Sequence, residues 1–158
     1  MLARLDLATF EIGALVDLPT EPADIVVHPT SGHAFVSCIG ADAVVEVDVA
    51  LAAIERKYAI LSKEPTFLSL DGERVLVAPR SSGNNGICDA GPNLLDQGEG
   101  RVLDLEDPSV ALQELPDHDL FGIVPGADAV PLLRDVGAVL FAHGVNPATG
   151  SFWQVGTE

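Results

Sequence analysis

The stretch that decides the fold is Glu21–Ser37, with the sequence EPADIVVHPTSGHAFVS. It consists of an apolar run, a tight turn and a second apolar run. The same order of features returns at Glu64–Ala78, EPTFLSLDGERVLVA, and more loosely at Phe141–Val155, FAHGVNPATGSFWQV. A unit that recurs along a chain indicates a repeat architecture, in which neighbouring units stack on one another.

Four short strands are predicted around the first copy of this unit. They are Ala23–His28, His33–Cys38, Ala43–Val49 and Lys57–Leu61. The connection Pro29-Thr30-Ser31-Gly32 is typical of a turn, because its glycine favours a positive φ. Successive strands that are joined by tight turns form an antiparallel meander.

The unit restarts at Pro65, which follows Pro22 by 43 residues. That interval lies within the ~40–45 residue period of four-stranded propeller blades. Further strands are predicted at Thr66–Leu70, Arg74–Ala78, Arg101–Leu105, Val110–Leu115, Ala138–Val145 and Ser151–Val155, and a hairpin at Ala3–Leu7 and Gly13–Leu18. Long irregular stretches are predicted at Pro79–Gly100 and Pro116–Arg134.

No stretch shows a sustained helical period, so we predict an all-β fold made of four-stranded antiparallel blades of an incomplete β-propeller. The expected units are residues 1–20 (end of one blade), 21–63 (full blade), 64–136 (blade with long inserted loops) and 137–158 (start of the next). A ring needs roughly 4–8 blades, and about two and a half cannot close it. We therefore expect a piece of a longer protein or, less favoured, association with copies of itself or a partner; a sandwich-like body of three sheets is the structural alternative.

The segment Glu21–Val49 resembles the YVTN-type bacterial β-propeller repeat. That repeat places a Pro-x-x-Gly turn before its YVTN signature and a VxVID strand after it. The matching positions are Phe35–Cys38 and Leu76–Pro79 for the signature, and Val47-Asp48 and Leu103-Asp104 for the final strand. The tyrosine and asparagine of the signature are absent here. The resemblance implies that the parent protein is an exported propeller, periplasmic or extracellular.

The chain is strongly acidic, with 8 basic and 24 acidic residues and a net charge of −16. Such a polyanion is repelled by phosphate backbones and acidic lipid surfaces, so neither nucleic-acid binding nor membrane insertion is expected. Between Ser81 and Leu133 the only basic residue is Arg101. Oxygen ligands on glycine-rich backbone suit Ca²⁺, and the candidate ligands are Asp89, Asp96 and Glu99. A solvated acidic loop is the alternative that we favour.

Three further residues are candidates for ligand contact. His118 lies between Asp117 and Asp119, an arrangement that can bind a metal or act as a base, although a polar turn is the favoured interpretation. The resemblance to propellers implies that the serine- and glycine-rich segment after the second strand reaches over the ring face. It thereby makes Arg80 and Asn84 candidate ligand contacts at the rim.

Aromatic and cysteine side chains receive structural interpretations. Phe35, Phe141 and Trp153 occupy matched or adjacent strand positions and are expected to pack between blades. Cys38 and Cys88 are the only cysteines, so a single disulfide and two free thiols both remain open.

Two functions are compatible with these features. The first is a non-catalytic ligand- or protein-binding scaffold, because a repeat framework with two long loops carries no nucleophile elbow or phosphate-binding loop. The second is part of a metal-dependent propeller enzyme of the lactonase or dehydrogenase type. The second function needs carboxylates or histidines that converge from several blades.

Overall fold

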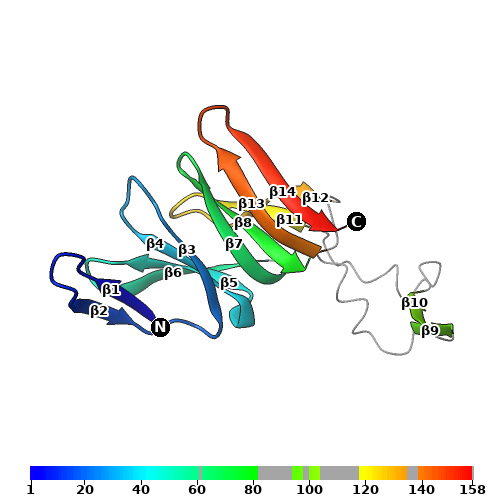
Figure 1. The fold of residues 1–158 in the computed structure, drawn as a ribbon, viewed down its shortest axis with the longest axis horizontal. Helices are drawn as coiled ribbons and strands as arrows, with labels where there is room; N and C mark the ends of the chain where they lie inside the picture. Colours follow the sequence, from blue (N-terminus) through cyan, green and yellow to red (C-terminus); the bar gives the residue numbers. More distant parts are fainter. Residues whose placement is uncertain (61, 82–93, 98–99, 104–117, 135–138, 158) are drawn as a thin grey trace.

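The structure, a computed structural model, describes residues 1–60, 62–81, 94–97, 100–103, 118–134 and 139–157. Apart from one short 3₁₀ turn, η1 (Ile39–Ala41), every helix or strand element in these ranges is a β-strand. The strands pair in antiparallel sheets, including a four-stranded meander (Figure 1). The predicted all-β class with propeller-like four-stranded blades is therefore confirmed. Within the described residues, no helix is long and apolar enough to cross a membrane.

The first half of the chain forms a hairpin and a four-stranded sheet. The hairpin pairs β1 (Leu2–Leu5) with β2 (Ile12–Val16). The sheet has the order β3-β4-β5-β6 and is the predicted meander. Its strands are β3 (Pro22–Val27), β4 (Ala34–Cys38), β5 (Ala43–Asp48) and β6 (Ala53–Ala59).

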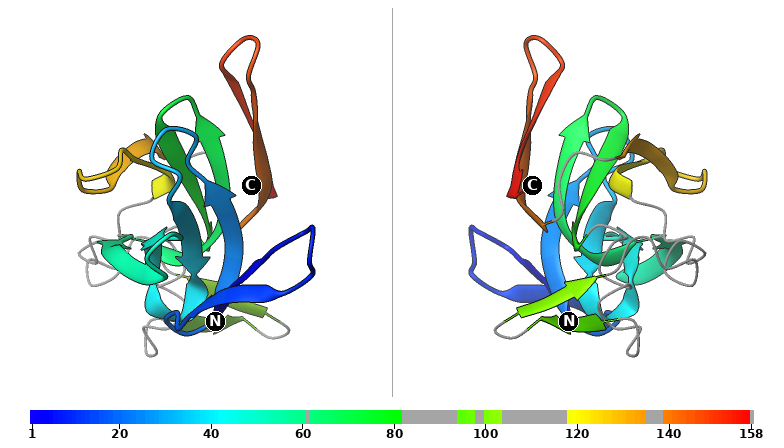
Figure 2. Two further views of the ribbon diagram at one scale, coloured as in Figure 1. Left: turned by 90° about the vertical axis from the view of Figure 1, so that its left-hand side faces the viewer. Right: turned by 90° about the vertical axis from the view of Figure 1, so that its right-hand side faces the viewer.

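The second half forms a branched sheet centred on β8. Its strands are β7 (Lys63–Asp71), β8 (Arg74–Ser81), β11 (His118–Ile123), β12 (Val130–Arg134), β13 (Val139–Asn146) and β14 (Ser151–Thr157). β7, β8, β11 and β12 repeat the meander of the preceding sheet. The hairpin β13–β14 joins β8 by one backbone pair, Val139 with Ser81. Figure 2 shows the β1–β2 and β13–β14 hairpins projecting from the body of the molecule.

The third strand of this second meander differs from the sequence prediction. Arg101–Leu105 was expected to occupy it, but β10 (Gly100–Leu103) pairs with β9 (Leu94–Gln97) instead. The strand beside β8 is β11, so the prediction of an irregular stretch at Pro116–Arg134 is wrong. A short apolar strand can pair with any suitable edge, and pairing across such a long connection has no local signal. The strand predicted at Val110–Leu115 lies outside the described residues.

Three apolar layers lie between successive groups of strands. The first lies between the β1–β2 hairpin and the β3–β6 sheet, the second between that sheet and β7–β8–β11, and the third between β7–β8–β11 and β13–β14. Their buried residues are Val16, Ala34, Val36, Cys38, Val45 and Val47 in the first layer; Phe35, Val44, Tyr58, Ile60, Leu68, Val75, Val77, Phe121 and Ile123 in the second; and Leu76, Ala78, Leu120 and Leu140 in the third.

Alternate residues of one strand enter different layers. In β8, Val75 and Val77 face the second layer, whereas Leu76 and Ala78 face the third. Side chains on a strand point to opposite faces in turn, so a strand buried on both faces must be apolar at every position. This explains the continuous run Val75–Ala78, and it explains the high hydrophobic content of a chain with few aromatic residues.

The backbone repeats as the sequence does. Gly32 and Gly150 occupy matched turns with φ of 71° and 68°, and each N–H donates to the carbonyl four residues earlier, His28 or Asn146. Phe10 and Ala52 likewise share a positive φ, 59° and 54°, in the turns after β1 and β5. These matches show that β13–β14 corresponds to β3–β4, and that β1–β2 corresponds to β5–β6.

The side chains Asp6 and Asp48 strengthen the second match. Each carboxylate accepts hydrogen bonds from the backbone N–H groups two and three residues later, at 2.7 and 3.1 Å for Asp6 and at 2.8 and 2.9 Å for Asp48. These donors, the N–H of Thr9 first for Asp6 and that of Leu51 first for Asp48, hold both carboxyl pKa values below the ordinary value.

The prediction that aromatic residues pack between blades holds for one of three. Phe35 is fully buried in the second layer. Its counterpart Trp153 is 71% exposed, so that prediction is wrong for Trp153. The reason is that Trp153 lies on β14, in a hairpin that projects from the body of the molecule (Figure 2). The side chain of Phe141 lies outside the described part of the chain.

Phe35 gives a direct test of the layered core. The change Phe35→Ala should lower the free energy of unfolding by about 3–5 kcal/mol, because it removes a large buried side chain and leaves a cavity. The matched change Phe10→Ala, at a 76% exposed turn position, should have little effect. Urea unfolding followed by circular dichroism measures both, and equal effects would contradict the assignment of Phe35 to a core layer.

Candidate functional site

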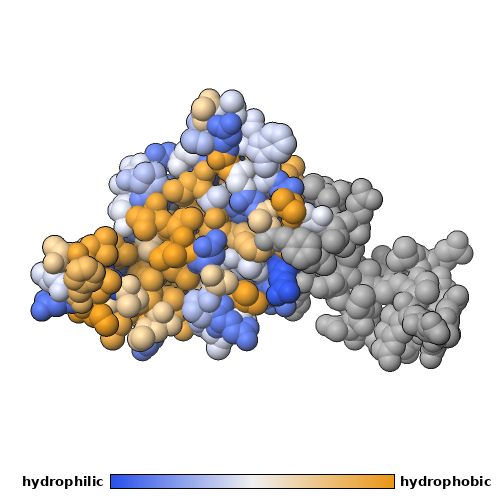
Figure 3. All heavy atoms as spheres, in the orientation of Figure 1, coloured by the Kyte–Doolittle hydropathy of each residue, from blue (hydrophilic) through white to orange (hydrophobic). Residues whose placement is uncertain are grey.

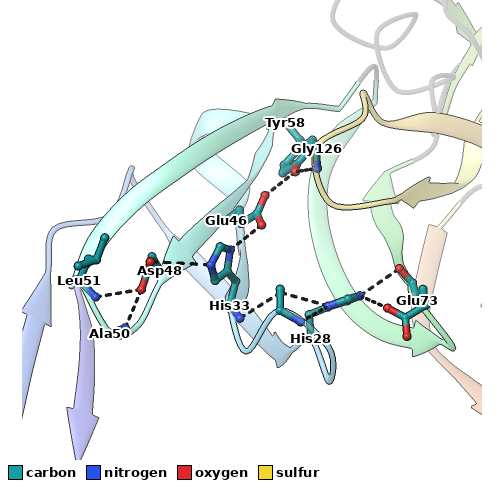
Figure 4. A network of polar contacts seen from close by, with 10 residues as sticks. His28, His33, Glu46, Asp48, Ala50, Leu51, Tyr58, Glu73 and Gly126 are labelled. Carbon is teal, nitrogen blue, oxygen red and sulfur yellow. Dashed lines mark hydrogen bonds and ion pairs between the residues drawn. The ribbon is translucent and has the colours of Figure 1, made fainter.

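The polar side chains that the structure brings together lie mainly at the edges of the second apolar layer (Figure 4). At the turn between β3 and β4, His28 is 2% exposed. The backbone N–H of Ser31 donates to His28 Nδ1 at 3.2 Å, so the ring proton lies on Nε2. Nε2 donates to the carbonyl of Glu73 at 3.1 Å, in the turn between β7 and β8. His28 therefore joins the turns of two successive sheets.

Glu73 makes a second contact across the same gap. Its carboxylate accepts the hydroxyl proton of Thr30 at 2.7 Å and lies 3.3 Å from His28 Nε2. The Glu73 side chain is 65% exposed, whereas the His28 side chain is 3% exposed. Water therefore screens the carboxylate, and the contact contributes mainly to orientation of the two turns.

A buried carboxylate lies further along the same edge. Glu46 of β5 is 4% exposed, and both of its oxygens have partners. Oε1 lies 2.7 Å from His33 Nδ1, and Oε2 accepts the hydroxyl proton of Tyr58 at 2.6 Å. The backbone N–H of Gly126 donates to the Tyr58 hydroxyl at 3.2 Å, from the turn between β11 and β12. The chain His33, Glu46, Tyr58 and Gly126 thus crosses from one sheet to the next.

Arg56 extends this chain to the surface. Its guanidinium lies 5.0 Å from the centre of the Tyr58 ring. It also donates to the carbonyl of Gly126 and to Asp128 Oδ1, each at 2.6 Å. Arg56 therefore clamps the β11–β12 turn against β6 and covers the Tyr58 ring.

This arrangement raises the pKa of Tyr58 to about 12. Burial is the main cause, and the hydrogen bond to Glu46 is the next, because a phenolate would lose that bond and face a carboxylate. A phenol with so high a pKa stays protonated under ordinary conditions. Tyr58 acts here as a fixed donor to Glu46 within the β3–β6 sheet, and its hydroxyl, held in place by that bond, accepts the Gly126 N–H of the next sheet.

A third polar contact lies at the opposite end of the strands. Asp24 Oδ2 accepts the N–H of Leu68 at 2.9 Å, and the Ser37 hydroxyl donates to the carbonyl of Thr66 at 3.1 Å. The N–H of Asp24 donates to Ser37 Oγ at 3.0 Å, which links the two side chains. Both ends of the second layer are therefore closed by hydrogen bonds between the β3–β6 sheet and the strands that follow.

The predicted ligand contacts fall where the acidic insertion, residues 82–117, leaves the branched sheet. Arg80 is exposed near the end of β8, and His118 opens the adjacent strand β11. His118 is 4% exposed and packs edge-on against Phe121, with 5.6 Å between ring centres. The favoured interpretation of His118 and Asp119 as a polar turn is wrong, because both lie buried in a strand. Asn84 lies outside the described residues.

The predicted calcium ligands are not placed by the structure. Asp89 and Glu99 lie outside the described residues, and Asp96 is described only through the backbone of β9, where it pairs with Arg101. In the described ranges, no group of three or more His, Cys, Asp or Glu side chains is arranged to hold a metal ion. Of the two cysteines, Cys38 is a free, buried thiol and Cys88 lies outside the described ranges.

The third layer contains polar side chains that the sequence did not single out. His143 lies between Phe67 and Phe152, at ring-centre distances of 6.5 and 5.4 Å, and pairs across the hairpin with Gln154. Burial lowers the pKa of His143, so the neutral ring is favoured. The sequence signal for His143 was the alternation of side chains along β13, which places His143 on the same face as Val145.

Glu46 tests whether this polar chain has a structural role. Glu46→Ala leaves the Tyr58 hydroxyl and His33 Nδ1 without their buried acceptor, so the free energy of unfolding should fall by about 1–3 kcal/mol. The control Glu55→Ala, at an exposed position on the neighbouring strand, should change it by less than about 0.5 kcal/mol. Urea unfolding measures both, and an unchanged midpoint for Glu46→Ala would contradict the structural role.

Tyr58 predicts a loss of stability at high pH. The pKa of a tyrosine is about 10 in an unfolded chain, whereas that of Tyr58 in the folded protein is about 12. The unfolded state therefore releases its proton first, and stability that is complete below pH ~10 falls as the pH rises toward 12. Tyr58 is the only tyrosine, so tyrosinate absorbance reports it directly. Tyr58→Phe should remove this part of the alkaline loss, and a titration midpoint near pH 10 in the folded protein would contradict the prediction.

Comparison with known proteins adds nothing to this description of the site. No protein-family model matches the chain, and no curated protein matches it significantly.

Proposed function

We propose that this chain is a non-catalytic binding module on a β-propeller framework of the YVTN type, and that its acidic insertion recognises a cationic ligand. The supporting observation is where the insertion is attached. It leaves β8 and returns at β11, two adjacent hydrogen-bonded strands. In the preceding sheet the corresponding connection, between β4 and β5, is only Ile39–Asp42.

The two strands that carry the insertion are firmly held. Val75 and Val77 of β8, and Phe121 and Ile123 of β11, are all buried in the second layer. Recognition segments commonly occupy loops that a rigid scaffold positions. A long connection between two fixed strand ends fits that arrangement.

The composition of the insertion suggests the class of ligand. It contains the acidic residues Asp89, Asp96, Glu99, Asp104, Glu106, Asp107, Glu114 and Asp117, and Arg101 is its only basic residue. Carboxylates attract cations and raise the rate of encounter with them. Ca²⁺ and a basic peptide surface share this chemistry, and both are suitable probes.

The test is calorimetric titration of the whole chain with Ca²⁺ and, separately, with an oligolysine peptide. The variant Asp89→Asn/Asp96→Asn/Glu99→Gln should bind the active probe roughly tenfold or more weakly. The control Glu11→Gln/Asp17→Asn/Glu55→Gln removes the same charge at exposed positions outside the insertion and should bind as the unaltered chain does.

Two results would overturn the proposal. One is that neither probe binds at low ionic strength, where attraction between exposed charges is strongest. The other is equal weakening in both variants, since that would reflect the total charge of the chain and not a binding segment.

A further inference from the structure

The two outer hairpins are complementary halves of the repeated four-stranded unit. β1–β2 corresponds to β5–β6, the last two strands of the complete sheet, as the matched turns at Asp6 and Asp48 indicate. β13–β14 corresponds to β3–β4, the first two strands, as the matched turns at Gly32 and Gly150 indicate. Each hairpin therefore has the half that the other hairpin does not have.

Each half also has an open edge. Among the described strands, β1 pairs only with β2, and β14 pairs only with β13. In the complete sheet, the corresponding strands β5 and β4 pair with each other along their length, from Ala34 with Val47 to Cys38 with Ala43. Open edges of this kind invite pairing with another strand.

The exposed apolar side chains fit the same pattern. Trp153 is 71% exposed, whereas its counterpart Phe35 is fully buried. Ile25 and Val27 of β3 are 46% and 57% exposed, whereas the equivalent positions of β7 are the buried Leu68 and the partly buried Leu70. Phe35 and Leu68 share the second layer. The internal repeat therefore shows what covers residues such as Ile25: a side chain in the position of Trp153.

Apolar side chains gather on the surface near both outer hairpins (Figure 3). Figure 3 shows apolar side chains gathered over β1 and β2 and over the neighbouring part of the β3–β6 sheet. An apolar groove lies at the other end of the series of layers, between the strands β11–β12 and the β13–β14 hairpin. Its lining includes Leu120, Leu132, Leu133, Val145 and Phe152.

We propose that two copies of this chain associate head to tail, so that β14 of one copy pairs with β1 of the other and completes a four-stranded sheet. The register follows from the β4–β5 pairing. The pair Ala34–Val47 of the complete sheet corresponds to Phe152 of one copy with Leu5 of the other. In the same way, Phe35–Glu46 corresponds to Trp153 with Arg4, and Ser37–Val44 corresponds to Val155 with Leu2.

Both faces of the composite sheet then become buried. On one face, Trp153 and Val155 cover Ile25 and Val27 of the second copy. Trp153 also lies opposite Arg4, a favourable pair for a cation and an indole ring. On the other face, Leu5 and Leu15 of the second copy, 47% and 53% exposed in one chain, enter the groove lined by Leu120 and Leu132 of the first.

The number of sheets agrees with a two-copy ring. Apart from the separate β9–β10 hairpin, the described strands of each copy form two complete meanders and two halves, which together amount to three blades. Two copies supply six blades, within the range of roughly 4–8 that closes a propeller, whereas one copy would supply three and three copies nine. Two identical head-to-tail contacts related by a two-fold axis close such a ring. The inference rests on the sheets and not on the acidic insertion, so mass measurement and cation titration test separate claims.

The test measures the molar mass of the whole chain by light scattering and by sedimentation. The unaltered chain should have twice the 16.5 kDa of one copy. Trp153→Asp and Leu5→Lys, at the two edges of the proposed contact, should each halve the measured mass. The control Leu51→Asp, at a 75% exposed position in the β5–β6 turn, should leave it unchanged. Trp153 is the only tryptophan, so its emission should shift to the red when the dimer is diluted.

Mixing separates a head-to-tail contact from other dimers and shows that the variants are folded. The Trp153→Asp copy keeps an intact β1 edge, and the Leu5→Lys copy keeps an intact β14 edge. An equimolar mixture should therefore recover the dimer mass through one intact contact. A monomeric unaltered chain, open-ended assembly that grows with concentration, or a dimer unaffected by Leu5→Lys would each overturn the proposal.

Discussion

Face-to-face burial of neighbouring sheets is the interaction on which the rest of the structure depends. Val75 and Val77 of β8 belong to one apolar layer and Leu76 and Ala78 to the next, so this strand has no side that faces water. Burial of apolar area stabilises a protein by roughly 25 cal/mol per Å². A single sheet of this kind gains that stabilisation only when a neighbour covers each of its faces, as in other proteins built from stacked repeats.

The polar contacts determine how the layers are oriented. Apolar side chains pack without strict directionality, whereas hydrogen bonds fix distances and angles. His28 donates to the Glu73 carbonyl and so joins two turns at one edge of the second layer. Nearby, Tyr58 donates to Glu46 of its own sheet and accepts the N–H of Gly126, in a turn of the next sheet. A shift between the sheets would separate the Gly126 N–H from the Tyr58 hydroxyl and the Glu73 carbonyl from the buried His28 ring, and would leave buried polar groups unsatisfied. These contacts therefore disfavour alternative packing of the same sheets.

Local features of the sequence predicted the fold well, and non-local features did not. The repeated Pro-x-x-Gly turn and the alternation Val45, Val47 predicted the β3–β6 meander, because turn and pleat are properties of adjacent residues. The partner of β8 could not be predicted, since β10 and β11 were both short apolar segments and only packing in three dimensions selects between them. The Glu46 site was equally hidden, because its direct partners, His33 and Tyr58, come from the β3–β4 turn and from β6. Tyr58 is bound in turn by Gly126, which lies in a turn of another sheet. Of the residues proposed as ligands, only Arg80 and His118 are described with their side chains.

The position of Cys38 has a chemical consequence for the protein. Its thiol is fully buried in the first layer, and burial raises its pKa. The thiolate is the nucleophile that attacks oxidants and alkylating reagents, so this sulfur is inert while β4 stays covered. Its modification would require the β1–β2 hairpin to move away from the β3–β6 sheet. The rate at which a reagent labels Cys38 is therefore a measure of how often the first layer opens. This holds in oxidising and in reducing surroundings.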